Sequence, residues 1–135
     1  MPIIPEQIAS DLLAWAVALF VIKHFLADFL LQTSWMAQGK ERLEGWMAPL
    51  LAHITVHALG TLLIALLLAP QLAWLAVIDL IIHGLIDRTK ALVQQRYHFK
   101  VEQAAYWWLL GTDQTLHHLT HLALAVWIAA AASSP

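Results

Sequence analysis

The stretch WMAPLLAHITVHALGTLLIALLLA, residues 46–69, decides the class of fold. It contains no Asp, Glu, Lys or Arg, and these four residue types are absent from the whole interval between Glu44 and Asp79. A membrane-spanning helix needs about 20 mostly apolar residues to cross roughly 30 Å of hydrocarbon. The stretch is long enough, so it predicts a transmembrane helix, although it contains two histidines, His53 and His57.

Three other segments are mostly apolar and lie on either side of this one. Together they predict an all-α, polytopic membrane protein, a four-transmembrane-helix bundle that forms a single domain over residues 1–135. Between the second and third spans, Ala69-Pro70-Gln71 predicts a tight break, because proline cannot continue the helical hydrogen-bond ladder. Before the last span, residues 91–110 predict an interfacial helix or a helix extension, with a plain loop as the alternative. The four predicted spans cover about residues 8–31, 47–69, 72–88 and 113–132.

The composition excludes several other classes of protein. The chain has 135 residues, of which 61% are hydrophobic and 12% charged; soluble domains have about 25% charged residues. Its mean hydropathy is +0.69. A net charge of −2 leaves no basic surface for nucleic acid. Cysteine is absent, so disulfides, thiolate zinc sites and cysteine nucleophiles are excluded.

The positions of Lys and Arg predict the orientation in the membrane. Residues 33–45, between the first two spans, carry Lys40 and Arg42, and residues 88–112 carry four further basic residues, whereas the link between the middle spans carries none. The positive-inside bias places both basic loops in the cytoplasm. It follows that both termini are expected on the outer side of the membrane.

Histidine and aspartate recur at intervals of four residues along all four predicted spans, so they share one face of each helix. At about 1.5 Å per residue, they lie between the cytoplasmic border and a depth of about 15 Å. Four polar stripes at one depth can meet only inside the bundle. The ten residues are His24, Asp28, His53, His57, Asp79, His83, Asp87, Asp113, His117 and His121.

These polar groups need partners once they are folded inside a membrane. An aspartate at the centre of a span costs about 2.5–3.5 kcal/mol on insertion scales. Lys23 is the one basic residue placed inside a span, so the carboxylates are expected to lack cationic partners and to repel one another. One or two divalent metal ions would neutralise the carboxylates. Imidazole and carboxylate ligands without sulfur suit Zn, Mn or Fe, and two ions could share an aspartate. The alternative is a network of interhelical hydrogen bonds without metal.

Four motifs resemble those of a family of small bacterial and phage inner-membrane proteins, classified as a domain of unknown function. They are HFLADFLLQ at 24–32, His53, HGLID at 83–87 with Lys90, and DQTLH at 113–117. The resemblance covers about residues 15–125. It implies a multi-pass protein of the bacterial inner (cytoplasmic) membrane, in which both termini are expected in the periplasm. It implies a shared polar set that includes Gln32, Lys90 and Gln114 and does not extend to His57, Asp79, His118 or His121. A looser similarity points to metal-dependent membrane-bound hydrolases.

The leading functional hypothesis is a metal-dependent hydrolase that acts on a lipid or a lipid-linked phosphate at the cytoplasmic side. Asp28 or Asp113 would serve as the catalytic general base. Gln32, Arg88, Lys90 and Gln114 would support the metal or hold the substrate. The alternatives are a metal or proton transport protein, and a haem- or pigment-binding or accessory subunit of a membrane complex. Membrane lipid is the expected partner, and a homo-oligomer or a larger complex stays open.

Overall fold

The computed structural model describes residues 7–133. All secondary-structure elements assigned in that part of the chain are helices, which confirms the all-α prediction. Residues 1–6 and 134–135, on which the predicted location of the termini depends, lie outside the described residues. The elements are α1 (Ser10–Phe25), η1 (Leu26–Leu30), α2 (Ser34–Gly39), α3 (Met47–Leu68), η2 (Pro70–Leu72), α4 (Leu75–Tyr97) and α5 (Ala104–Ser133).

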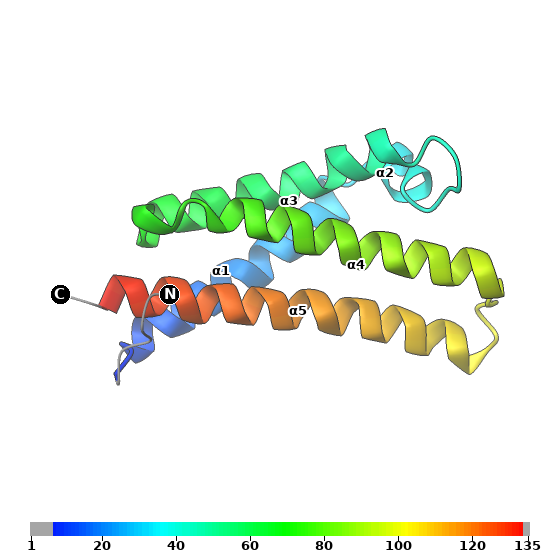
Figure 1. The fold of residues 1–135 in the computed structure, drawn as a ribbon. Helices are drawn as coiled ribbons and strands as arrows, with labels where there is room; N and C mark the ends of the chain where they lie inside the picture. The colour runs from blue at the N-terminus through cyan, green and yellow to red at the C-terminus, as the bar shows by residue number, and fades with distance from the viewer. Residues whose placement is uncertain (1–6, 134–135) are drawn as a thin grey trace.

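Four long helices form one bundle. In Figure 1, α3, α4 and α5 run alongside one another and α1 crosses them obliquely. Helix α3 packs mainly on α4, and α1 mainly on α5. The link between α3 and α4 lies at one end of the bundle, whereas α2 and the link between α4 and α5 lie at the other (Figure 1). The two loops that contain most of the basic residues are therefore at the same end.

Three of the helical segments are long and apolar enough to cross a membrane, which indicates a membrane protein. They are Ser10–Leu30, Met47–Leu68 and Ala104–Ser133. Helix α4 is not among them, because it carries Asp79, Asp87, Arg88, Lys90 and Arg96 within 23 residues. The structure thus supports three of the four predicted spans by length and composition, and α4 takes the fourth place in the bundle.

Several helix boundaries differ from the sequence-based prediction. For residues 91–110 the structure shows a helix extension, one of the two predicted alternatives, and not a separate interfacial helix: they comprise the end of α4, a non-helical link at 98–103 and the start of α5. The predicted break at Pro70 is present as the short 3-10 helix η2. Helix α2 lies in the segment expected to be only a loop, and the Thr33 hydroxyl caps it by accepting from the Met36 amide at 3.3 Å.

The end of the first span forms a π turn, which the sequence did not predict. The Leu31 amide donates to the Leu26 carbonyl at 2.9 Å, five residues back. Such turns insert an extra residue into a helix and are frequent at functional sites. This one contains Asp28, so it changes how that carboxylate is presented relative to the preceding turns of α1.

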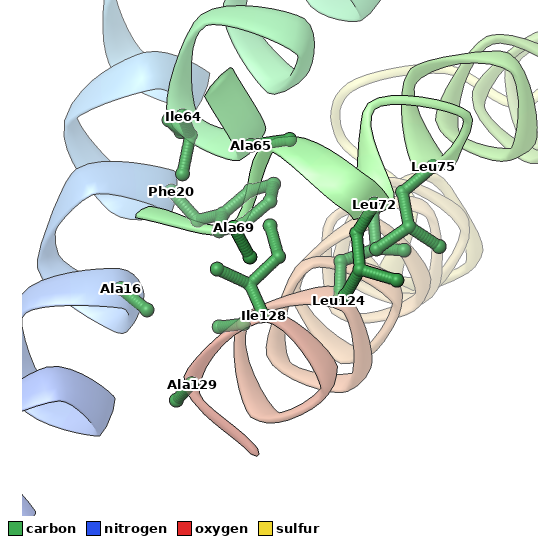
Figure 2. Packing of buried hydrophobic residues seen from close by; sticks show 11 residues of the cluster. Ala16, Phe20, Ile64, Ala65, Ala69, Leu72, Leu75, Leu124, Ile128 and Ala129 are labelled. Atoms are coloured by element: carbon green, nitrogen blue, oxygen red, sulfur yellow. The ribbon is translucent and has the colours of Figure 1, made fainter. Parts of the chain in front are cut away.

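The apolar core fills one half of the bundle, at the end where α3 joins α4. Figure 2 shows Phe20 of α1, Ile64 of α3, Leu75 of α4 and Ile128 of α5 converging there. The Ala9 amide donates to the Ser133 hydroxyl at 3.0 Å and ties α1 to α5 at this end. Since apolar side chains occupy this half, the buried polar side chains of the four helices gather in the other half.

Candidate metal centre

All ten predicted residues lie in the half of the bundle opposite the apolar core, and they form one polar cluster. Nine of them are buried, and Asp28 is half-buried. The interval of four residues explains their inward direction, because it keeps the side chains on one face of each helix. The structure therefore brings together every residue that the sequence suggested as a metal ligand.

Asp28 meets histidines from two helices. Its Oδ1 atom lies 3.0 Å from His57 Nε2 and 3.4 Å from His53 Nε2, both on α3. Its Oδ2 atom lies 3.1 Å from Nε2 of His24 on α1. Three imidazoles thus point at one carboxylate.

Asp87 on α4 repeats this pattern nearer the basic loops. Its Oδ1 atom lies 3.2 Å from His117 Nε2, and its Oδ2 atom lies 3.3 Å from His53 Nε2. Lys40, just after α2, donates to Oδ2 at 2.8 Å. His53 Nε2 stands between Asp28 and Asp87, so the two carboxylates belong to one continuous site.

Asp79 lies closest to the apolar core and has a different set of partners. Its Oδ2 atom accepts from Lys23 Nζ at 2.7 Å and from the Thr61 hydroxyl at 2.6 Å. His121 Nε2 lies 3.4 Å from Oδ1 and 3.0 Å from Lys23 Nζ. The ring of Phe20 stacks on His121 with centroids 5.3 Å apart, which marks the boundary with the apolar half.

His83 occupies the middle of the cluster without a hydrogen bond. Its side chain is 1% exposed, and neither ring nitrogen has a hydrogen-bond partner. The carboxylate of Asp87 lies 3.9 Å from Nε2, beyond hydrogen-bond length. The rings of His57 and His117 flank it with centroids 3.8 and 4.0 Å away. Burying polar atoms unpaired is costly, and such atoms in native proteins usually have a partner.

Four groups of side chains could hold a metal ion, and within each the candidate ligand atoms all lie within 4.8 Å of one another. His83 belongs to three of them. Their imidazole nitrogens and carboxylate oxygens are ligands that zinc, manganese and iron accept. The groups are Asp28, His53, His57 and His83; His83, Asp87 and His117; Asp79, His83 and His121; and His24, His57 and His121.

Asp113 lies at the edge of the cluster and belongs to none of these groups. Its Oδ1 atom lies 3.5 Å from His117 Nε2, and its Oδ2 atom accepts from Gln114 Nε2 at 3.1 Å. The Gln114 Oε1 atom lies 3.2 Å from His24 Nε2, so this amide connects α5 to α1. Gln32 reaches the site through the backbone, since its Nε2 atom donates to the Asp28 carbonyl at 2.8 Å.

A cavity of about 210 Å³ opens into the cluster from the end with the basic loops. We call it the mouth cavity. Lys90 lines it and donates to Glu41 at 2.8 Å, which fastens the loop after α2 to α4. The residues that line the cavity are Asp28, Phe29, Gln32, Ala37, Lys40, Glu41, Asp87, Lys90, Leu110, Asp113 and Gln114.

Two side chains considered in the sequence analysis, those of Arg88 and His118, do not line the mouth cavity. Arg88 donates to the Arg42 carbonyl at 2.8 Å and stacks over the Trp46 ring at 4.1 Å, so it holds the loop rather than lining the cavity. His118 is exposed on α5, although its ring lies 4.9 Å from that of His24.

Sequence reasoning missed Lys23, Lys40 and Thr61 as members of the site. A lysine inside a span usually faces the interior and pairs there, so Lys23 carried a usable signal. Lys40 lies in a loop, and Thr61 in an apolar run, so neither had a comparable signal. The two lysines correct the expectation that the carboxylates would lack cationic partners.

The fold and the site define a class: a helical bundle of the membrane type, with a polar His/Asp cluster buried in one half. The chain belongs to the protein family of unknown function DUF3307, whose family model matches residues 16–134. This confirms the uncharacterised family that the four motifs resemble, but a relationship to membrane-bound hydrolases is not shown. Neither a curated protein nor a solved structure matches the chain.

Proposed function

We propose that this protein binds a divalent transition metal ion, Zn, Mn or Fe, in the His/Asp cluster. The observation that carries the proposal is His83, a fully buried imidazole whose two ring nitrogens make no hydrogen bond. A metal ion bound to one of these nitrogens would use the lone pair of that nitrogen. No described side chain donates a hydrogen bond to it. Histidine and aspartate side chains from α3, α4 and η1 stand close enough to complete the coordination.

The charges in the cluster support one divalent ion. Two ammonium groups, Lys23 and Lys40, pair with two of the carboxylates. With every histidine neutral, two negative charges are left, and one divalent ion balances them. A second ion would need an additional anionic ligand, such as hydroxide or a substrate phosphate. The four carboxylates are Asp28, Asp79, Asp87 and Asp113.

Metal analysis tests the proposal directly. We expect the purified protein to contain one to two equivalents of Zn, Mn or Fe. Because the ion binds the folded state, its removal by a chelator should lower the free energy of unfolding. The expected loss is about 2.7 kcal/mol, compared with protein at a free metal concentration of about 100 times Kd. Elemental analysis and thermal unfolding in detergent, before and after chelation, measure both effects. Metal-free protein whose unfolding does not respond to any of the three ions would contradict the proposal.

We place the cluster at the cytoplasmic side of a bacterial inner membrane, with four spans and both termini periplasmic. The pattern of α4 supports its assignment as the remaining span. Val77, Ile81 and Leu85 are exposed on one face at intervals of four, and Asp79, His83 and Asp87 are buried in the cluster. Such a helix can contact lipid although its average composition is polar, since Asp79 and Asp87 are buried inside the bundle and its basic residues lie toward the end with the basic loops.

As a finer proposal, the bound ion catalyses hydrolysis of a lipid or lipid-linked phosphate. A metal ion lowers the pKa of a bound water toward about 7 and polarises a phosphoryl oxygen. Asp28 and Asp113 both line the mouth cavity, but Asp113 belongs to no candidate ligand group, so it is better suited than Asp28 to act as general base. Lys40 and Lys90 line the same cavity, where a phosphate headgroup would enter.

Phosphate release from vesicles tests this catalytic role. We expect metal-loaded protein to release inorganic phosphate from phosphatidic acid or from a polyprenyl phosphate. Asp113→Asn should slow the reaction by about 10²–10⁴-fold, the usual contribution of a general base, and leave the metal content unchanged. Absence of release with both substrates would reject the hydrolase and leave metal binding intact.

Transport is the less favoured alternative, and the apolar core is the reason. Phe20, Ile64, Leu124 and Ile128 fill the half of the bundle beyond His121, so the polar cluster is closed at that end. A path for protons or ions needs polar groups or water across the whole membrane. A haem-binding or accessory role in a larger membrane complex is less favoured because four carboxylates exceed what a haem pocket requires.

A further inference from the structure

We infer that Lys23 is a built-in cation that takes the place of a metal ion in the inner layer of the cluster. The inner layer consists of Lys23, Thr61, Asp79 and His121. This inference rests on the proposed metal binding, and it goes further by stating where the metal cannot bind. Two of the four candidate groups include His121, and both would be closed to metal in the natural protein.

The contacts of the ammonium group carry the inference. Lys23 Nζ lies 2.7 Å from Asp79 Oδ2 and 3.0 Å from His121 Nε2. An ammonium group has only donors, so His121 Nε2 accepts with the lone pair that a metal ion would need. The same Asp79 oxygen also accepts from Thr61 at 2.6 Å. Asp79 Oδ2 and His121 Nε2 are therefore already used, while Asp79 Oδ1 makes no hydrogen bond. The occupied His121 lone pair is what closes both groups to metal.

The stem of Lys23 is fitted into the wall of the bundle. A Cβ atom added at Gly60 of α3 would lie 2.7 Å from Lys23 Cγ, so glycine leaves the space through which the stem passes. An apolar groove between α1 and α3 runs along this contact, lined by residues such as Leu19, Leu59 and Leu63. Among the described residues that line it, Lys23 is the charged one. The groove offers the ammonium no competing anion, which keeps it on Asp79.

The outer groups differ from the inner layer at their histidines: among the described side chains, no lysine donates to an imidazole nitrogen of these groups, although Lys40 donates to Asp87 Oδ2. Their histidine lone pairs stay free for a metal ion. Asp28 with His53, His57 and His83 forms one outer group, and His83 with Asp87 and His117 forms the other. They share His83, and a neutral imidazole has one lone pair for a metal. The metal is thus confined to the region between Asp28 and Asp87, next to the mouth cavity.

Replacing Lys23 tests the inference by a gain of metal. Lys23→Met removes the ammonium and leaves Asp79 and His121 with free lone pairs. We expect the variant, loaded with zinc and washed, to bind about one more zinc ion per chain than the wild type, because an unpaired buried carboxylate favours a cation. Lys23→Arg should keep the wild-type zinc content. The double variant Lys23→Met/Asp79→Leu should lose the additional ion.

A second variant keeps the test decisive if Lys23→Met does not fold. His121→Gln should bind as much zinc as the wild type, because His121 uses its lone pair on Lys23. Loss of zinc from His121→Gln, or no gain in a folded Lys23→Met, would overturn the inference. A wild-type protein that binds no zinc, manganese or iron would instead overturn the proposed metal binding, so the two failures are distinguishable.

Discussion

Purified His83→Ala is expected to bind zinc, manganese or iron about 100-fold more weakly than the wild type. This value is the upper end of the range for residues that hydrogen-bond to a metal ligand without binding the metal themselves. His83 belongs to three of the four candidate ligand groups, whereas no other residue belongs to more than two. The His83 ring lies next to His53 and His57 on α3 and next to His117 on α5. Its removal therefore takes away the ligand that lies between the two helices. Elemental analysis after dialysis against a weak chelator measures the change.

The matched control is His98→Asn. His98 is exposed in the link between α4 and α5, outside the cluster. Its backbone has φ 52°, a left-handed conformation that asparagine tolerates, so the replacement changes neither the fold nor the site. The control should keep the wild-type metal content. Wild-type affinity in a folded His83→Ala would show that the centre does not depend on this residue.

Asp79→Leu is expected to lower the free energy of unfolding by about 3–5 kcal/mol, the usual cost of removing one partner from a buried ion pair. The reason is that Lys23 is 6% exposed and the Asp79 carboxylate lies 2.7 Å from its ammonium. Without that carboxylate the charge is left unpaired between the helices. Denaturant unfolding in mixed micelles measures the loss.

The double variant Lys23→Met/Asp79→Leu provides the control. Replacing a buried ion pair with apolar residues of similar volume is often neutral or stabilising. We expect the double variant to recover most of the stability lost in Asp79→Leu. If its stability equals that of the single variant, the loss comes from packing around the substituted side chain and not from the unpaired ammonium.

Much of the helical architecture is readable from the sequence. The apolar run at 46–69 corresponds to α3, whose structure begins at Met47 and ends at Leu68. Pro70 marks the break between α3 and α4, because proline lacks the amide that a continuing helix needs. The π turn at Leu26–Leu30 had no signal, since it depends on how the end of α1 packs and not on local propensity.

The candidate site is readable to a similar extent. The interval of four residues predicts that Asp79, His83 and Asp87 share one face of a helix, and all three are buried together. Their different partners are not predictable in this way. Asp79 faces Lys23, and Asp87 faces Lys40, from segments 56 and 47 residues away.

Apolar helices with histidine and aspartate on one face of each are predictable from the residues alone, because these features depend on spacing within a single helix. Which carboxylate receives an ammonium group, and which faces imidazoles, depends on how the helices pack. That choice depends on the oblique path of α1 across the bundle, which sets Lys23 against Asp79 and Asp28 against the α3 histidines. Contacts between distant segments arise only when the helices pack, so no local pattern could encode them.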